Sequence, residues 1–289
     1  MARRRFPDEP YSRLAIWARR LALFSVVAAV LAIIIVRSGI IEVLPGLMTF
    51  GSVLAVAALA VLLALMSLVP IWRQGVRGLG YAVLAMLIGG ALLGYPAYLG
   101  YKAYELPAIT DITTDVLDPP AFDAIRRLRS RATNPVQYAG LYAAEQQREA
   151  YPDIAPLELN VSPKIAYDHA LALVNKRRWL VIDSREPRPN QREGRIEAVA
   201  RTPIMGFRDD VVIRIRGNDE ESRVDMRSSS RYGFHDIGSN AERISTFLEN
   251  LEENIDVALE REQRRRPPPK KTVPIKATKD SKSPPQAKR

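Results

Sequence analysis

The distribution of apolar residues divides the chain into a hydrophobic first third and a polar remainder. Three stretches without a charged residue cover about residues 21–36, 47–69 and 79–101. Because an α-helix rises about 1.5 Å per residue, the last two stretches are long enough to cross a hydrocarbon core about 30 Å thick. The first is shorter, but the arginines that flank it can reach the lipid headgroups. The pattern predicts three transmembrane helices within residues 1–101.

The basic residues indicate how these helices are oriented. Arginines gather before the first stretch and recur as Arg73 and Arg77 between the second and third, and such residues are enriched on the cytoplasmic side of membranes. Three spans then place the polar remainder outside. No A-x-A-like cleavage site followed by a polar segment comes after the first stretch, so we expect an uncleaved anchor. We expect a bacterial inner (plasma) membrane protein with a cytoplasmic amino terminus and a periplasmic or external soluble domain.

The composition of the apolar stretches favours anchoring over transport. They contain no Asp, Glu, Lys, Arg or His, the residues that usually mark ion and proton pathways. The third stretch contains Gly90-x-x-x-Gly94, a spacing that lets two helices approach closely. The neighbouring helix could belong to the same chain or to a second copy.

Four segments of the polar remainder have the composition of strands. In the third, Val211, Ile213 and Ile215 alternate with other residues, as in a strand with one buried face. One apolar face and one wetted face predict an antiparallel sheet that helices cover on one side. The expected strands are Trp179–Arg185, Arg195–Thr202, Asp210–Arg216 and Ser222–Ser228.

Helices are expected around these strands, at about residues 120–131, 136–150 and 163–178 and from residue 239 onward. The last has the strongest signals, since Ser239–Glu242 fits a capping box and apolar residues recur behind it at helical spacing. The predicted fold class is α+β: three N-terminal transmembrane helices, then a four-stranded antiparallel sheet packed against helices, and a disordered basic C-terminal tail. The predicted parts are a transmembrane region (1–101), an extended linker (102–118), a soluble domain (119–263) and a Pro/Lys-rich tail (264–289).

Charge and cysteine usage limit the function classes. The net charge of +10 comes mainly from the two ends of the chain. A basic disordered tail can bind anionic lipid or glycan by charge alone, or simply remain solvated. The predicted topology excludes nucleic acid as a partner. The chain has no cysteine, which excludes disulfides, thiolate metal sites and cysteine nucleophiles, and we expect no cofactor.

The densest polar segment, MRSSSRYGFHDIGSNAERI, covers residues 226–244 and follows the segment FRDDV at residues 207–211. Together they resemble the bacterial and plant family called "domain of unknown function 1499", whose pattern is approximately F-x-D-D-V, then R-S-x-S-R-x-G, then D-x-G-x-N-x-x-R. The resemblance spans much of residues 155–260. Many members also have an Asn-x-Cys-Val segment, which this chain lacks. The resemblance implies no established activity.

The same residues allow three interpretations from their chemistry. The first is an ion-pair network that closes the sheet edge onto the last helix, and we favour it. The second is an arginine clamp for an anionic ligand at a helix amino terminus. The third is an enzyme that uses Ser228–Ser230 with His235 and Asp236, although adjacent turn residues rarely give triad geometry. Their spacing fits no standard zinc or calcium motif, and we expect no metal ligand or catalytic residue. The candidate cluster is Asp209, Asp210, Arg227, Arg231, Asp236, Asn240 and Arg243.

The predicted function follows from these parts. We expect an integral membrane protein with a non-catalytic, envelope-facing binding or scaffolding domain. The alternative is a hydrolase-like enzyme at the membrane surface that uses the Ser228–Asp236 segment. The expected partner is membrane lipid. Anionic headgroups or envelope polymers would bind through the basic tail or the arginine cluster.

The predicted topology can be tested by fractionation and proteolysis. The full-length protein should sediment with membranes and enter solution only with detergent, because its apolar helices require a lipid-like solvent. Protease added to intact spheroplasts should remove the soluble domain. Full-length protein in the supernatant without detergent, or a domain that is protected until the membrane is permeabilised, would contradict the predicted arrangement.

Overall fold

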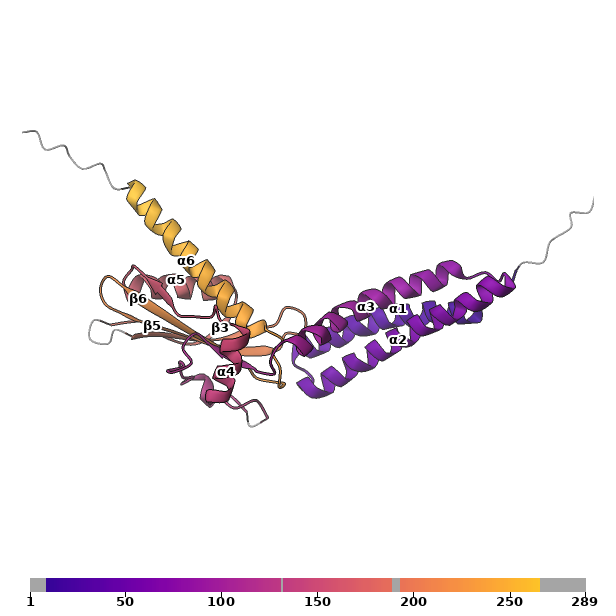
Figure 1. The fold of residues 1–289 in the computed structure, drawn as a ribbon, viewed down its shortest axis with the longest axis horizontal. Helices are drawn as coiled ribbons and strands as arrows, with labels where there is room; N and C mark the ends of the chain where they lie inside the picture. The colour runs from indigo at the N-terminus through magenta and orange to yellow at the C-terminus, as the bar shows by residue number, and fades with distance from the viewer. Residues whose placement is uncertain (1–8, 131, 189–192, 266–289) are drawn as a thin grey trace, which may run out of the picture.

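The computed structural model describes residues 9–130, 132–188 and 193–265, and shows an elongated molecule with a helical bundle at one end and an α/β domain at the other (Figure 1). Each bundle helix is long and apolar enough to cross a membrane. The chain therefore has the three apolar N-terminal helices that its sequence predicts. They are α1 (Arg13–Ser38), α2 (Val43–Gln74) and α3 (Leu79–Glu105).

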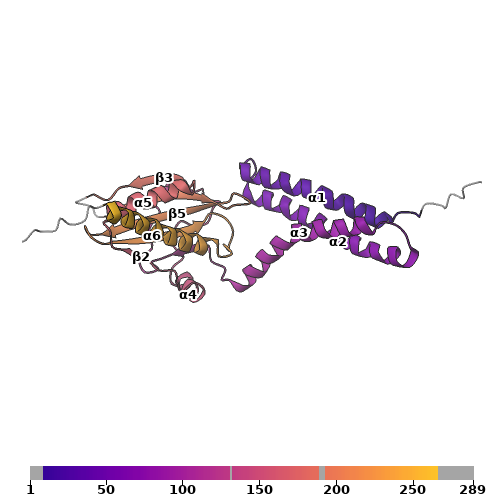
Figure 2. The same cartoon turned by 90° about the horizontal axis from the view of Figure 1, so that it is seen from above.

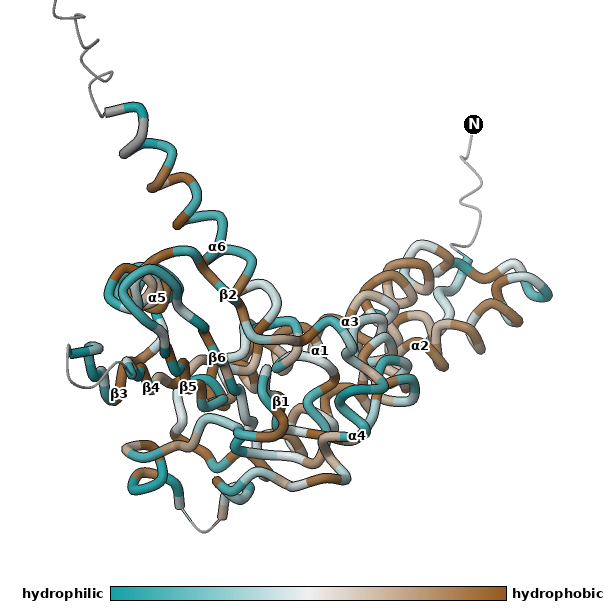
Figure 3. Tube along the Cα trace, turned by 60° about the vertical axis from the view of Figure 1, so that its left-hand side comes forward, coloured by the Kyte–Doolittle hydropathy of each residue, from teal (hydrophilic) through white to brown (hydrophobic). Residues whose placement is uncertain are grey.

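Small residues line the interior of the bundle, and large apolar residues cover its exterior. Ala15, Ala18 and Ala22 of α1 are fully buried against Ala60 and Ala64 of α2. Figure 3 shows that the bundle helices are coloured mainly as apolar. A bundle in water would bury its large side chains, whereas a bundle in lipid gains most from close backbone packing. The large side chains that are more than half exposed include Phe24, Leu31, Leu62 and Leu87.

The α/β domain is built on an antiparallel sheet of six strands. Strands β3 to β6 form a meander in which each strand pairs with the next. Both β1 and β2 pair with the free edge of β6, at different points along it. The strands are β1 (Asp111–Thr113), β2 (Leu157–Leu159), β3 (Leu180–Arg185), β4 (Glu193–Arg201), β5 (Arg208–Gly217) and β6 (Ser222–Ser230).

The prediction of four strands was therefore wrong, because the sheet also contains the two short edge strands β1 and β2. Three residues are too few to show the alternation that identifies a strand, and the pairing of β1 and β2 is imposed by β6. The segment 102–118, expected as an extended linker, contains the end of α3 and all of β1. The chain thus enters the sheet within six residues of leaving the bundle, because α3 ends at Glu105 and β1 begins at Asp111.

Two helices, α5 (Pro163–Lys176) and α6 (Ser239–Arg265), cover one face of the sheet (Figure 2). The apolar stripe of α6 packs on strand residues of this face, with Ile244, Phe247 and Leu251 fully buried. We call it the helix face. Most of the predicted tail, residues 266–289, lies outside the described residues.

The opposite face of the sheet, which we call the second face, is not wetted as the alternation suggested. The segment after β1 crosses it, and Phe122 and Ile125 of that segment pack on Val199 and Val212. This segment was expected to be a helix at about 120–131, but in its described residues, 120–130, it contains only a 3-10 turn, η1 (Ile125–Arg127). The carboxylate of Glu197, fully buried on β4, accepts the backbone N–H groups of residues 123–125 at 2.8–3.1 Å. A sheet side chain therefore holds this turn in place.

Helix α4 (Leu141–Ala150) completes the edge of the sheet beside β1. The Gln147 side chain is buried; its Oε1 accepts the N–H of Thr113 at 3.1 Å, and its Nε2 donates to the Thr113 carbonyl at 2.7 Å. One amide thus makes the two bonds that a neighbouring strand would make. Because both backbone groups of Thr113 are satisfied in this way, the short strand presents no free bonding pair there.

Two adjacent glycines of α3 provide a test of the bundle packing. A Cβ added at Gly89 would lie 2.3 Å from Val61 Cγ2, whereas one added at Gly90 would meet nothing within 4 Å. We expect Gly89→Ala to lower the free energy of unfolding in detergent by about 1–3 kcal/mol through overpacking, and Gly90→Ala to change it by no more than about 0.5 kcal/mol. Unfolding by sodium dodecyl sulfate, followed by circular dichroism, measures both. Equal effects of the two substitutions would contradict this packing.

Candidate functional site

The seven predicted site residues lie near the end of the sheet that faces the bundle, but on two different faces. Asp209 points to the helix face, and its neighbour Asp210 points to the second face, because successive residues of a strand alternate. The sequence therefore located the region, and the structure divides it into separate clusters. Arg243, Asn240 and Asp236 join Asp209 on the helix face.

The helix-side cluster ties the start of α6 to β5 and β6. Arg243 donates to Asp209 at 2.5 Å, and also to the Ser228 hydroxyl at 2.8 Å. Asn240, which is fully buried, accepts from Ser228 Oγ at 2.7 Å and donates to Ser230 Oγ at 2.9 Å. Burial raises the pKa of Asp209, while the charge of Arg243 and a hydrogen bond from Ser230 oppose the rise. These polar groups use one another as partners, as a buried network requires.

Asp236 provides the cap of α6. Its Oδ1 accepts the N–H of Gly238 at 3.0 Å, and its Oδ2 accepts the N–H of Asn240 at 3.0 Å. Both are backbone donors that the first turn of a helix cannot satisfy itself. Burial raises the pKa of the Asp236 carboxyl, and these two hydrogen bonds act in the opposite direction. The cap thus comes from a residue before the expected capping box that begins at Ser239.

Asp210 lies fully buried on the second face between two guanidinium groups. Arg129 Nε donates to one carboxylate oxygen at 2.6 Å. Arg231 donates to the other oxygen through Nε at 2.9 Å and Nη2 at 2.7 Å. Arg129 also donates to the carbonyl of Asn134 at 2.7 Å, so it holds its own loop closed. Sequence reasoning missed Arg129, because its pairing with Asp210 spans 81 residues of chain.

Arg227 pairs with a carboxylate outside the predicted cluster, that of Asp111. Its Nε and Nη2 donate to the two oxygens of Asp111 at 2.9 and 2.6 Å, and its guanidinium lies 4.8 Å from the centroid of the Phe122 ring. Burial raises the pKa of Asp111, and the hydrogen bond and charge of Arg227 oppose the rise. Arg227 therefore forms an ion pair inside the domain, and its guanidinium also lies over an aromatic ring.

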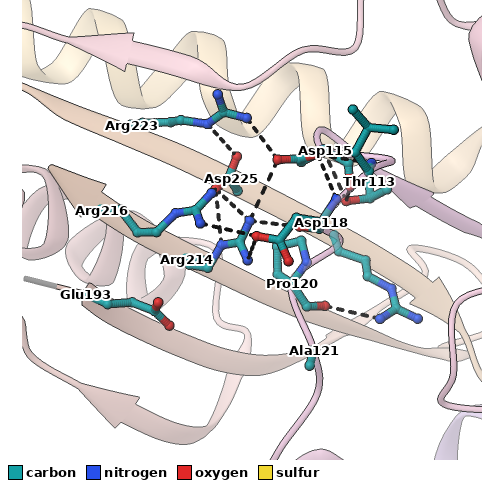
Figure 4. Close-up of polar contacts among 12 residues, drawn as sticks. Thr113, Asp115, Asp118, Pro120, Ala121, Glu193, Arg214, Arg216, Arg223 and Asp225 are labelled. Atoms are coloured by element: carbon teal, nitrogen blue, oxygen red, sulfur yellow. Dashed lines mark hydrogen bonds and ion pairs between the residues drawn. The ribbon is translucent and has the colours of Figure 1, made fainter.

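A third group, the distal cluster, lies on the second face farther from the bundle (Figure 4). Asp225, fully buried, accepts from Arg214 at 3.0 Å, from Arg216 at 2.9 Å and from Arg223 at 3.0 Å. Two loop carboxylates balance the excess positive charge: Asp115 pairs with Arg223, and Asp118 with Arg214 and Arg216. The corresponding distances are 3.0, 2.9 and 3.2 Å.

The pKa of Asp115 reflects the balance of charges at the distal cluster. Burial acts to raise the pKa of its carboxyl, but the N–H groups of Asp118 and Leu117 and the charges of Arg223 and Arg214 outweigh burial, so the pKa lies below its usual value. Three carboxylates meet three guanidinium groups here. The arrangement matches charges internally instead of leaving arginines open to a ligand.

The serines and histidine of the enzymatic interpretation have separate partners. Ser228 and Ser230 bond to Asn240, and Ser229 Oγ accepts from Arg129. His235 Nδ1 accepts the N–H of Ile237 at 2.9 Å, and Nε2 lies 3.2 and 3.1 Å from the carbonyls of Ala103 and Leu106 at the end of α3. The imidazole and the three hydroxyls therefore do not form the nucleophile–base pair that a triad requires. Within residues 9–130, 132–188 and 193–265, no group of three or more His, Asp or Glu residues is arranged to hold a metal ion.

The buried pair of arginines around Asp210 yields a stability prediction. Asp210→Asn leaves Arg129 and Arg231 buried without a counter-charge, so we expect the free energy of unfolding to fall by about 3–5 kcal/mol. Asp168→Asn is the matched control, because it breaks the exposed pair with Lys164 and should cost no more than about 1 kcal/mol. Urea unfolding of the detergent-solubilised protein measures both. Similar losses in the two variants would contradict the role of Asp210.

Comparison with known protein families covers the same part of the chain. Residues 111–251 match the model of the family described as Protein of unknown function (DUF1499), a range that begins at β1 and ends within α6. No curated protein and no solved structure shows significant similarity to the chain. The match contains all seven candidate residues and the partners Asp111 and Arg129. Over residues 111–251 the α/β domain is therefore similar to the DUF1499 family, and it follows three helices that are long and apolar enough to span a membrane.

Proposed function

We propose that this protein is a membrane-anchored, non-catalytic binding or scaffolding protein whose α/β domain is held in a fixed orientation on its helical bundle. The observation that carries the proposal is a pair of contacts between the domain and two different bundle helices. They are additional to the covalent connection at the end of α3. A domain that must present one surface to a partner benefits from such a support, because a domain that is already oriented loses less rotational freedom on binding.

The first contact joins the end of α1 to the turn between β4 and β5. Arg37 Nη1 donates to the carbonyl of Pro203 at 2.6 Å and to that of Ile204 at 3.2 Å. Gly206, with φ of 71°, completes the turn against the Arg37 side chain, and an added Cβ would lie 3.0 Å from Arg37 Cγ. A charged donor on two backbone carbonyls is a strong contact for an exposed position.

The second contact joins the end of α3 to the loop between β6 and α6. Because His235 Nδ1 accepts the N–H of Ile237, its Nε2 carries the proton and donates to the carbonyls of Ala103 and Leu106. Carbonyls at the end of a helix lack an internal partner. His235 therefore caps the carbonyls at the end of α3 and fixes the loop at the same time.

The orientation in the membrane and the partners complete the proposal. In this proposal the bundle end that carries Arg77 is cytoplasmic, and the α/β domain faces the periplasm or cell exterior. Membrane lipid surrounds the bundle, and anionic headgroups or envelope polymers bind the basic segment 264–289 by charge. The internal pairing of the sheet arginines supports a domain that serves as a stable frame. No observation favours the hydrolase-like alternative, and we do not propose it.

The fixed orientation can be measured with paired spin labels, because the chain has no native cysteine. Labels at Leu44→Cys near the domain end of α2 and at Glu253→Cys on α6 should give a narrow distance distribution by pulsed electron resonance in lipid nanodiscs. Adding Arg37→Ala with His235→Ala should broaden it, because both extra contacts are lost. Arg73→Ala, at the other end of α2, is the control and should leave it narrow. A broad distribution in the otherwise native chain would reject the proposed support.

A further inference from the structure

The end of the domain that faces the bundle exposes large apolar side chains. Phe234 is 83% exposed in the loop that His235 attaches to α3, and Ile204 is 42% exposed in the turn that Arg37 attaches to α1. Single exposed apolar residues are common on soluble surfaces, so the position of Phe234 beside the bundle carries more weight than its exposed fraction alone. Both residues are held beside the ends of helices that are long and apolar enough to span a membrane.

The exposed aromatic residues of α3 continue toward this surface. Tyr98, Tyr101 and Tyr104 lie in its last two turns and are 53%, 58% and 90% exposed. Tyrosines at such positions occupy the boundary between hydrocarbon and headgroups. Phe234 therefore lies next to the level at which the helix itself meets the headgroups.

A pair of facing arginines flanks the same turn. Arg201, the last residue of β4, is the register partner of Arg208, the first residue of β5, and both are exposed. Like charges directly opposite each other destabilise a strand pair. Among the described residues neither has a carboxylate within 4.0 Å, in contrast to the paired arginines of the sheet interior. An anionic group outside the chain would relieve this repulsion.

We propose that this end of the domain binds the adjacent membrane leaflet, with Phe234 inserted between lipid headgroups and Arg201 and Arg208 on lipid phosphates. The inference rests on the proposed attachment of the domain to the bundle, and names lipid as the ligand of this surface. Apolar insertion beside basic residues is the usual combination at membrane surfaces. We call Phe234, Ile204, Arg201 and Arg208 the membrane-facing surface.

The test uses single cysteines in the full-length chain reconstituted in liposomes. An environment-sensitive fluorophore at Phe234→Cys should emit at shorter wavelength and be quenched several-fold more by lipids with a nitroxide at the headgroup than the same fluorophore at Leu117→Cys. Leu117 is a matched control, since it is an apolar residue 82% exposed beside the distal cluster. Equal, weak quenching at the two positions would overturn the proposal.

The arginines are tested in the Phe234→Cys background with neutral and with partly anionic liposomes. Arg201→Glu with Arg208→Glu should reduce the quenching, and more strongly in anionic liposomes, whereas Arg126→Glu on η1 should not. Unchanged quenching in anionic liposomes would overturn the phosphate contact. Circular dichroism melting of each variant verifies that the domain remains folded. A narrow spin-label distance together with an unquenched fluorophore would reject the lipid contact and retain the rigid attachment.

Discussion

A carboxylate that leaves water on folding must be neutralised where it lies, and this constraint organises the α/β domain. Asp210 and Asp225 have fully buried side chains on the second face, and an unpaired charge there would cost more than most single contacts contribute. Their guanidinium partners come from the sheet and its end, and from Arg129 on the segment after β1, which covers this face and is called the covering segment below. The covering segment can therefore take few paths across the sheet, although it has little regular secondary structure. We interpret these pairs as specifying that path more than as adding stability, since well-packed apolar residues stabilise as well or better.

The family pattern has a physical explanation in the alternation of a strand. Arg227 and Arg231 lie on the second face and bond to carboxylates. Ser228 and Ser230, between them in the sequence, point to α6 and bond to Asn240. The adjacent aspartates at the start of β5 divide in the same way, one for each face. The pattern thus combines residues from both faces of the same end of the sheet. Each position is constrained by a partner on another element, which accounts for a polar motif in the interior of a domain without a triad.

What the sequence could predict depended on how local each signal is. The bundle, strands β3 to β6 and the start of α6 have patterns within a single segment, and they were predicted from those patterns. Strands β1 and β2 have no such pattern, because β6 determines their pairing. The partner of Arg227 is 116 residues away in what was expected to be a linker. The sequence therefore located a candidate cluster near one end of the sheet, but it missed Arg129 and Asp111. It also did not show the pairing or the covered second face, since alternation distinguishes two faces but does not show what packs on each.

The contact at Arg37 has a different consequence from the contact at His235. The covalent connection at residues 106–110 alone would let the domain rotate about the axis of α3. His235 bonds beside that connection, so it limits bending but has little leverage against rotation. Arg37 bonds from a different helix, and rotation about α3 would separate it from the β4–β5 turn. Its acceptors are exposed carbonyls that water can satisfy, so losing this contact would release the orientation without unfolding the bundle or the sheet. In the proposed arrangement, the direction in which the domain faces therefore depends mainly on Arg37 at the end of α1, a position where the arginines of membrane-spanning helices usually meet lipid headgroups.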